Sequence, residues 1–516
     1  MSLQESDARS LGNRFSTEED TANIHHGNTK NQPKTKYENA FHQILAALKK
    51  QLKQSHFKFS VAGEESQFTR FNGAKVRQTG QVCDSKMTLT LISEESISER
   101  ISSAESTATK PTLKEESSLA ELEAGYRTTT LSLPFVGEFE TDWQSLKPAL
   151  ESLQTELINL PIDPYVVLPS ADDRTPRAHH SREIYAGKLL QPSQLIEALL
   201  SPVQSLDFSG LYAGGQAYRG YADSAGKQHW FETPSFTLDY SLFEQVGESK
   251  AAVKGTLAGH QWTQNDYEQS IATAQEQLTM SARARKQLQK GRYSTYLAPA
   301  AVADIIDTIA CGGGLGEAAL RQGNSPFSRL EKGEAVLSSQ FSLGEDFQRV
   351  GRPRFNADGE IAPMQLPVVQ HGRWVEALVN GRSEQEYGKP SNGANGAEAL
   401  RAASVAPGNL PEKDVLRALD TGLYVSNVHY LNWSDLTAGH ITGMTRYACF
   451  WVENGEVIAP IENLRFDDDL YRFLGEGLIA LTDRQTFVPA VGTYERRSLG
   501  GMWVPGMLIN DFRYTL

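Results

Sequence analysis

The sequence predicts an α+β protein with two large domains, a helix-plus-sheet domain followed by a strand-rich domain. A chain of 516 residues is too long for one ordinary hydrophobic core. Helical periodicities occur in both halves, and short apolar runs bounded by Gly, Pro or Asn lie between them. We therefore expect an N-terminal arm at 1–36, a first domain at 37–290 and a second domain at 291–516.

Charge and cysteine content limit the partners and the location of the protein. The chain has 50 Lys and Arg against 63 Asp and Glu, and 50 − 63 = −13 argues against a nucleic-acid-binding surface. Its three cysteines, Cys83, Cys311 and Cys449, form no C-x-x-C pair, which favours a reducing compartment. No apolar run approaches the ~20 residues that span a bilayer. We expect a cytoplasmic protein that contacts neither nucleic acid nor membrane.

The first domain should begin with a helix that packs on strands. Residues 1–36 lack regularly spaced apolar side chains, so we expect a disordered arm. Tyr37–Leu52 has the 3.6-residue apolar period of an amphipathic helix. Asn72-Gly73 is a type I′ turn signal between two strands, and Met87–Ile92 predicts a further strand. These elements predict a helix over a small antiparallel sheet.

The remainder of the first domain mixes helices and strands. Polar residues 93–118 indicate an exposed loop or a long polar helix, and the sequence leaves that choice open. Leu150–Leu160 has a helical pattern, and Tyr165–Leu168, between two prolines, predicts a short buried strand. Residues 206–240 predict several short strands separated by glycine turns. Thr263–Gln289 lacks Pro and Gly and predicts a long helix that leads to the second domain.

The second domain should open with a helix and continue mainly as strands. Pro299 starts an apolar helix that the glycine run Gly312–Gly314 stops. Ala448–Ile458 predicts a hairpin that turns at Asn454-Gly455. Phe466–Tyr471 resembles a helix start with Asp467 as N-cap, so we interpret its acidic triplet as a cap and not as a calcium site.

No motif for catalysis stands out among the residues. The eleven histidines form no H-E-x-x-H, H-E-x-x-x-H or H-x-H arrangement. His179, His180 and Glu183 have helical metal-ligand spacing, but a nearby proline and charged neighbours indicate a surface segment. There is no G-x-S-x-G elbow, and the glycine run after Cys311 lacks the G-K-[ST] ending of a phosphate loop.

One resemblance is more specific. Residues 422–470 read GLYVSNVHYLNWSDLTAGHITGMTRYACFWVENGEVIAPIENLRFDDDL and resemble the C-terminal core of the TldD/PmbA peptidase family. Three other segments resemble the family in the same order: RFNGAKVRQTG, AYRGYADSAGKQHWFE, with Asp223 where Asn is usual, and VVQHGRWVEALVNGRSEQEYGKPSNG. The resemblance covers about Tyr37–Leu516 and implies the two-domain α+β architecture of that family.

The resemblance also implies where zinc should be bound, and this sequence departs there. The family's peptidase subunit holds zinc with an H-E-x-x-x-H helix and a cysteine near the C-terminus. The corresponding segment here, IIDTIACGGGLGE, has Asp307, Thr308 and Gly312 at the three motif positions, and 491–516 contains no cysteine. The resemblance therefore implies a metallopeptidase-related pseudoenzyme that holds no cofactor, with zinc in a partner subunit. Whether the chain is itself a hydrolase stays uncertain.

The leading hypothesis is a non-catalytic companion of a TldD-type zinc peptidase. It would pair with that subunit as a heterodimer, or with itself as a homodimer, and present unfolded peptides for proteolysis or peptide maturation. We expect the surface that contacts substrate or partner to include Asn427, His429, Tyr430, Trp433, Arg446 and Trp451.

Two other hypotheses remain open. One is a hydrolase with its own atypical metal site at His429, Asp435 and His440. The other is a peptide-binding scaffold that acts without any peptidase.

Overall fold

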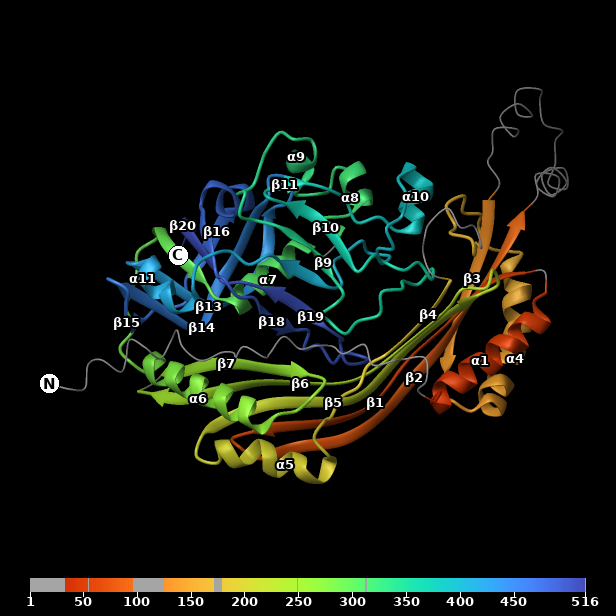
Figure 1. The fold of residues 1–516 in the computed structure, drawn as a ribbon, viewed down its shortest axis with the longest axis horizontal. Coiled ribbons are helices and arrows are strands. Elements are labelled where there is room, and N and C mark those ends of the chain that lie inside the picture. The colour runs from red at the N-terminus through yellow and green to blue at the C-terminus, as the bar shows by residue number, and fades with distance from the viewer. Residues whose placement is uncertain are drawn as a thin grey trace.

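The computed structural model describes residues 33–53, 55–95, 125–170, 179–247, 249–310 and 313–515. The first half forms a long curved sheet with helices. The second half lies above this sheet in Figure 1 and forms a barrel and another sheet. The α+β class is thus confirmed. Residues 1–32 of the arm predicted at 1–36 lie outside the described residues. Helix α1 starts at Lys36, the last residue of the predicted arm. None of the helices in these ranges is long and apolar enough to cross a membrane.

A seven-stranded sheet dominates the first half. Its order is β3-β2-β1-β5-β6-β4, and β7 also pairs with β6. The pair β4–β6 is parallel, and the others are antiparallel. The strands are β1 (His56–Asn72), β2 (Val76–Glu95), β3 (Gly125–Pro134), β4 (His180–Ile184), β5 (Asp207–Asp223), β6 (Gln228–Val246) and β7 (Ser249–Gly259).

Alternating side chains give this sheet two different faces. On the face that carries Phe57 and Phe59, helices α1 (Lys36–Gln51) and α4 (Phe139–Leu157) bury one end. Helices α5 (Pro192–Leu200) and α6 (Gln264–Ser281), with η3 (Ser201–Val203), pack farther along the sheet around Phe71 and Phe208. The opposite face is concave and turns toward the second half of the chain (Figure 1).

The glycine-rich residues 206–240 do not form several short strands, as the sequence suggested. They belong to two long strands, β5 and β6. Gly215 lies inside β5, where a Cβ would come 2.0 Å from the carbonyl oxygen of Glu65 on β1. The glycine therefore permits close contact between neighbouring strands and marks no turn.

The first hairpin turns one residue later than predicted. Asn72 ends β1, and the two turn residues with positive φ are Gly73 and Ala74, at 57° and 51°. Asn72 and Lys75 exchange backbone hydrogen bonds across this two-residue turn. The dipeptide was recognised correctly, but Asn72 belongs to the strand.

Five strands of the second half close into a barrel, because β13 pairs with both β8 and β14 and the remaining pairs complete the circle. Asn454 and Gly455 supply the positive φ values of the β14–β15 turn, as predicted. The barrel strands are β8 (Gly291–Leu297), β13 (Gly422–Asp435), β14 (His440–Glu453), β16 (Arg465–Asp469) and β20 (Met507–Tyr514), with β15 (Glu456–Pro460) beside β14 and β17 (Leu478–Leu481) beside β20.

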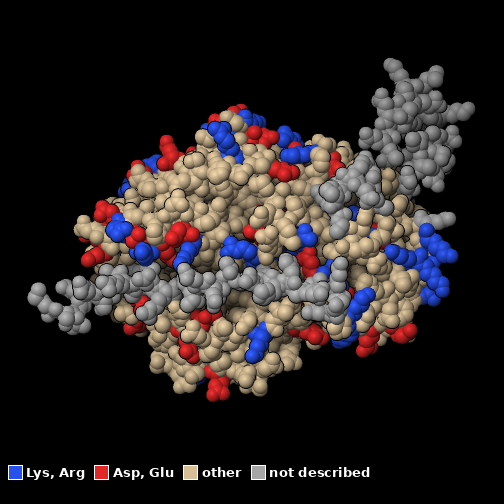
Figure 2. Space-filling view, viewed as in Figure 1, with Lys and Arg blue, Asp and Glu red and all other residues tan. Residues whose placement is uncertain are grey.

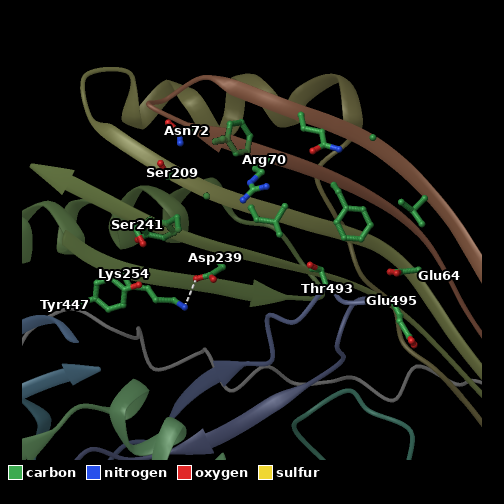
Figure 3. A pocket seen from close by; sticks show the side chains of 18 residues that line it. Glu64, Arg70, Asn72, Ser209, Asp239, Ser241, Lys254, Tyr447, Thr493 and Glu495 are labelled. Carbon is green, nitrogen blue, oxygen red and sulfur yellow. Dashed lines mark ion pairs between the residues drawn. The ribbon is translucent and has the colours of Figure 1, made fainter. Parts of the chain in front are cut away.

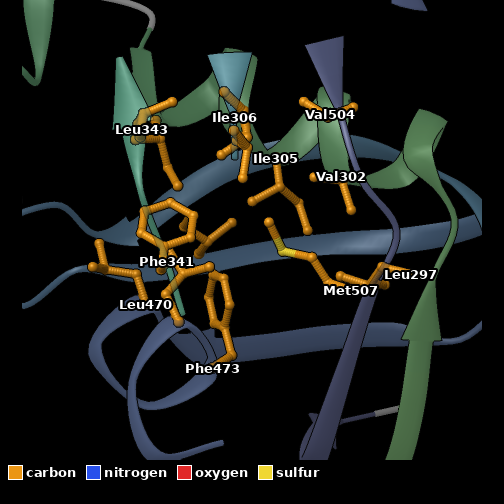
Figure 4. Close-up of a cluster of buried hydrophobic side chains, with 14 of the residues drawn as sticks. Leu297, Val302, Ile305, Ile306, Phe341, Leu343, Leu470, Phe473, Val504 and Met507 are labelled. Atoms are coloured by element: carbon orange, nitrogen blue, oxygen red, sulfur yellow. The ribbon is translucent and has the colours of Figure 1, made fainter. Parts of the chain in front are cut away.

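Helix α7 (Pro299–Ala310) packs against barrel strand β13 and against β18 and β19 of a six-stranded sheet. It begins at the predicted proline, and its apolar side chains belong to the largest hydrophobic core of the molecule (Figure 4). The sheet has the order β11-β10-β9-β12-β19-β18, formed by β9 (Leu343–Asp346), β10 (Gln365–Gln370), β11 (Arg373–Trp374), β12 (Ala403–Val405), β18 (Thr486–Pro489) and β19 (Gly501–Val504).

Short helices complete the second half. They are α8 (Glu317–Arg321), α9 (Ser328–Glu331), α10 (Gly381–Tyr387), η5 (Glu412–Asp414), α11 (Val415–Leu419) and the π-helix η6 (Arg472–Glu476). The strands of the first sheet end at Gly259, and the first barrel strand begins at Gly291. On this basis we propose to keep the domain division between 37–290 and 291–516.

The helix start expected at Phe466–Tyr471 comes later than predicted, because Phe466 to Asp469 lie in barrel strand β16 and helical residues begin at Leu470. Asp469, the last acid of the triplet, accepts from the backbone amide of Tyr471 at 2.8 Å. Asp467 caps no helix. Phe466 is buried against Phe512, and Asp468 is buried in an ion pair with Arg472. Long-range pairing therefore overrides a local sequence pattern that is typical of a helix start.

Two other predictions for the first half also need correction. Tyr165–Leu168 is not a strand, and only Asp163 forms an isolated bridge, to Tyr126. The long helix predicted to reach Gln289 ends as α6 at Ser281. Residues 96–118 of the polar segment lie outside the described residues.

Candidate functional site

Helix α7 carries Asp307 and Thr308, two of the three positions at which the family resemblance implies the zinc motif. Asp307 is exposed, and the hydroxyl of Thr308 donates to the backbone oxygen of Asp304 at 2.9 Å. Asp304 is half-buried beside β13, where the backbone amide of Val428 donates to its carboxylate. Burial nevertheless raises the pKa of Asp304 to about 6. Gly312, at the third motif position, lies outside the described residues.

The residues of α7 do not fit a zinc ion. They offer two carboxylates three positions apart and no imidazole, and the Thr308 hydroxyl is bonded to the helix backbone. Cys449 is buried, its Sγ donates to the Arg446 carbonyl at 3.2 Å, and burial raises the pKa of its thiol to about 11. Among the residues that the structure describes, no group of three or more His, Cys, Asp or Glu side chains could hold a metal.

Four of the six predicted surface residues gather next to α7, where β13 pairs with β14. Asn427 lies opposite Arg446, whose Nη1 is 3.5 Å from Nδ1 of His429. Burial and the charge of Arg446 lower the pKa of His429, so its imidazole is neutral near pH 7. Tyr430 is 78% exposed, and its ring centroid lies 4.4 Å from that of His429.

The other two predicted surface residues, both tryptophans, do not join this group. Trp433 lies farther out on β13 and packs half-buried against the barrel core. The ring of Trp451 packs edge-on against Tyr293 at 5.8 Å, and the ammonium group of Lys286 lies 4.5 Å from its centroid. Trp451 therefore has a packing role that is sufficient to explain its presence.

Two tyrosines on these strands have strained backbones. Tyr430 has φ 52° and Tyr447 has φ 65°, a region that bulky side chains rarely adopt. Both lie at interruptions of the β13–β14 ladder. At one of them Tyr447 and the residue after it form a β-bulge on β14, opposite the single residue Ser426 of β13. The Arg446 guanidinium lies 4.6 Å from the Tyr447 ring centroid. Strain of this kind, about 1–3 kcal/mol per residue, gathers at functional sites.

The alternative metal sites are not assembled. Asp435 lies opposite His440 in the β13–β14 ladder. His429, however, lies opposite Met444, which is four residues and so about 13 Å along β14 from His440. His440 instead approaches Asp467, with Nδ1 3.8 Å from Oδ1. His180 and Glu183 belong to strand β4 and not to a helix, and His179 precedes that strand.

A cavity of about 740 Å³ opens between the concave face of the first sheet and the second half (Figure 3). Its volume lies within the range of ligand pockets, roughly 300–1,000 Å³. On the face shown in Figure 2, acidic and basic side chains are interspersed over the central region. The second half contributes Tyr447, Thr493 and Glu495, and the sheet contributes Glu64, Phe68, Arg70, Phe71, Asn72, Gln78, Gly80, Val82, Ser209, Gly210, Leu211, Asp239, Tyr240, Ser241 and Lys254.

Rows of side chains in register across four strands make the cavity floor. One row contains Asn72, Ser209, Ser241 and Lys254, and the next contains Gln78, Arg70, Leu211 and Asp239. Lys254 and Asp239 form an ion pair at 3.2 Å. The charges of Lys254 and Arg446 both act on Asp304 of α7, where they lower its pKa against the larger effect of burial. Charged groups of the cavity floor and of the predicted surface therefore lie close enough to α7 to interact electrostatically with Asp304.

A loop from the second half closes one end of this floor. Arg497 and Glu64 are both 2% exposed, and Arg497 Nε lies 3.0 Å from Glu64 Oε2. The same guanidinium donates to Ser66, to Ser235 and to the Gly215 carbonyl. We call residues 491–498 the clamp loop. It belongs to the segment in which the family's cysteine is missing.

None of Arg70, Lys254 and Arg497 could be predicted as a site residue from the sequence. They come from parts of the chain that are far apart, and although Arg70 begins the family-like segment RFNGAKVRQTG, nothing in that segment distinguishes the arginine. The only signal that could have drawn attention to the clamp loop was its position in the segment without the expected cysteine.

Among solved structures, three with the same fold come from different organisms. TldE from Thermococcus kodakarensis has a TM-score of 0.67 at 12% identity, over 92% of this chain and 100% of that chain. A protein from Bacteroides thetaiotaomicron, described as a candidate modulator of DNA gyrase, has 0.67 at 13% identity, over 93% and 98%. A similarly described protein from Thermotoga maritima has 0.65 at 12% identity, over 92% and 100%. At these identities the likeness shows the fold alone, and no curated protein matches the chain.

A family match is more specific than these fold similarities. The family described as PmbA/TldA metallopeptidase C-terminal domain matches residues 290–515, from the first barrel strand to the last. The matched residues include α7, the predicted surface on β13 and β14, and the clamp loop. Residues 290–515 therefore belong to the C-terminal domain of the TldD/PmbA family, and the fold of nearly the whole chain agrees with that of the solved structures.

Proposed function

We propose that this chain is the non-catalytic companion of a TldD-type zinc peptidase in the cytoplasm. The observation that carries the proposal is the composition of α7, which has Asp307 and Thr308 where the zinc motif falls. Without a ligand set for zinc, the chain's own residues supply binding and positioning, and the metal and its activated water belong to the partner. The shared fold with TldE supports the same assignment.

The proposed task is to enclose an unfolded peptide for proteolysis or peptide maturation. The cavity has a floor of amides and hydroxyls that can bond to peptide groups. Strand β7, at one side of this floor, pairs on one edge with β6 and with no other strand of the described part of the chain. An extended peptide can bind such an edge through main-chain hydrogen bonds, largely regardless of its sequence.

A cleavage assay with purified subunits tests the companion role. We expect the chain alone to leave a quenched fluorescent, unfolded peptide intact. A zinc-bearing homologue from the same genome should cleave it faster in the presence of this chain, and a chelator should abolish that cleavage. Chelator-sensitive cleavage by the chain alone would contradict the proposal and favour a hydrolase with its own metal site.

The exposed Tyr430 offers a test of the predicted surface. Tyr430→Ser should weaken either association with the homologue or the stimulation of cleavage, because the tyrosine is 78% exposed and has a strained backbone. Ile158→Ser, at a side chain that is 65% exposed beyond α4, is the matched control and should change neither. Analytical ultracentrifugation measures association. Loss of association assigns the surface to the partner, and loss of stimulation alone assigns it to the peptide. If neither changes, the surface prediction is wrong.

The scaffold hypothesis makes a different prediction about genome organisation. A companion subunit should be encoded beside a homologue that contains H-E-x-x-x-H, whereas an independent scaffold has no such requirement. If the chain bound peptides but associated with no such homologue, the scaffold hypothesis would replace the companion role.

A further inference from the structure

We propose that the cavity is a subsite for a carboxylate-bearing residue of the bound peptide and that Arg70 is the group that recognises the carboxylate. The inference rests on the proposed peptide-binding function and adds a preference for acidic residues. It is independent of whether a zinc-bearing partner performs the cleavage.

The charge balance of the cavity leaves Arg70 as the cation of the floor that has no partner. Glu64 is paired with the buried Arg497, and Asp239 is paired with Lys254. Arg70 is exposed on β1, and within the described ranges its guanidinium has neither a hydrogen bond nor an ion pair. Its guanidinium points from the floor into the cavity (Figure 3). An arginine in this position can bind a carboxylate through two parallel N–H···O bonds.

The neighbours of Arg70 suit a peptide that carries the carboxylate. Gln78 lies beside Arg70 in the same row, and Asn72 and Ser209 are in the adjacent row, so amide and hydroxyl groups surround the guanidinium. Apolar contact is available from Phe68 and Leu211. At the far side, the bulge directs the strained Tyr447 into the cavity lining, which is a second sign that ligand contact has shaped this wall.

Glu495, the other unpaired charge of the cavity, determines on which side the acidic group of the ligand lies. Glu495 is exposed on the clamp loop and lines the cavity on the side opposite the sheet. Its carboxylate repels an acidic ligand there, so the acidic group should lie against the floor at Arg70. Removing the charge of Glu495 should therefore not weaken the binding of an acidic peptide.

Fluorescence anisotropy with the full chain and labelled unfolded peptides tests the inference. The probes share one sequence and differ at a central Asp, replaced by Asn in the second peptide, and both have amidated C-termini. A third peptide has Asn at the centre and a free C-terminal carboxylate. We expect the Asp peptide to bind about tenfold more tightly than the amidated Asn peptide, since charge-assisted hydrogen bonds at a partly solvated site reach the lower end of ~1.5–3 kcal/mol. Tight binding of the third peptide would show that a chain terminus supplies the carboxylate.

Variants identify the residue that recognises the carboxylate. Arg70→Gln should abolish the preference for Asp over Asn, and Arg70→Lys should keep part of it. The matched control is Arg283→Gln, because Arg283 is exposed just beyond the end of α6 and does not line the cavity. Glu495→Gln should leave the preference intact or increase it. Equal binding of the Asp and Asn peptides, no binding of either, or an unchanged preference in Arg70→Gln would each overturn the inference.

This outcome is separable from that of the cleavage assay. Binding without charge preference would refute the Arg70 subsite and leave the companion role standing. A preference for Asp without any stimulation of a zinc-bearing homologue would refute the companion role and leave the subsite standing.

Discussion

Replacement of Arg497 by methionine should lower the free energy of unfolding by about 3–5 kcal/mol, as is typical when one partner of a buried ion pair is removed. Arg497 and Glu64 are each 2% exposed, so the variant leaves a carboxylate without a counter-charge in a buried site. It also removes the donors to Ser66, Ser235 and the Gly215 carbonyl. The clamp loop should detach from the sheet at the same time.

Chemical denaturation and limited proteolysis together test this expectation. The midpoint of unfolding should fall, and cleavage within 491–498 should become faster before the rest of the chain unfolds. Arg496→Met is the matched control, since Arg496 Nε lies 3.0 Å from Oδ2 of Asp84 without the alignment of a hydrogen bond, and the Asp84 side chain is 45% exposed. It should cost less than about 1 kcal/mol. The double variant Glu64→Gln with Arg497→Met should recover part of the loss, and a loss equal to that of Arg496→Met would refute the buried-pair argument.

The clamp loop occupies the segment in which the family resemblance implies a zinc ligand. The family resemblance implies a cysteine ligand in the C-terminal segment, and in this chain that segment presents Arg497 to the first sheet. The same segment thus contributes to contact between the two halves. Its neighbours Thr493 and Glu495 become part of a cavity wall.

Local sequence signals predicted those parts of the fold that depend on neighbours in the chain. Pro299 marks the start of α7, the apolar period of 37–52 marks α1, and Asn454-Gly455 marks a hairpin. In each case, the residues that determine the backbone lie within one element. The start of α7, the helix in which the family resemblance implies the zinc motif, could thus be located from the sequence.

Predictions failed where distant strands decide the conformation. The segment from Phe466 has acids placed as in a helix start, yet Phe466 packs against the distant Phe512, and the Asp468 carboxylate accepts from the backbone amide of the distant Arg513 at 2.8 Å. Gly215 looked like a turn residue because sequence alone cannot show the Glu65 carbonyl that lies against it. Arg70 could not be identified for the same reason, since its significance depends on charges paired elsewhere and on a cavity wall supplied more than 370 residues later in the chain.

A histidine between the two halves should make the folded state sensitive to acid. His229 on β6 is 1% exposed, with Nε2 donating to the Gly359 carbonyl at 3.1 Å and Nδ1 accepting from the Ser181 hydroxyl at 2.9 Å. The bond that Nδ1 accepts requires a neutral ring, whereas the bond to Gly359 also forms with a protonated ring and acts to raise the pKa of His229. Burial, together with the nearby charges of Lys227, His180 and Arg354, lowers the pKa of His229 to about 4.

The direction of the pH effect follows from that shift. Between the unfolded pKa of about 6.5 and the folded pKa of about 4, the unfolded chain binds more protons at this position. The contribution of His229 is therefore complete above pH 6.5 and decreases as the pH falls to 4, by roughly 3 kcal/mol at 1.36 kcal/mol per pKa unit. Asp304 acts in the opposite direction, since its pKa is raised to about 6 and its protonation favours the folded state.

Because several groups titrate in this window, the difference between parent and variant isolates His229. His229→Gln keeps an amide donor for the Gly359 carbonyl and removes the titrating ring. The variant should be less stable at pH 7.5 but should lose less stability than the parent between pH 6.5 and 4, as measured by denaturation midpoints at several pH values. Parallel profiles for the two proteins would show that His229 is protonated in the folded state without penalty. The contact between β6 and the Gly359 loop would then tolerate acid.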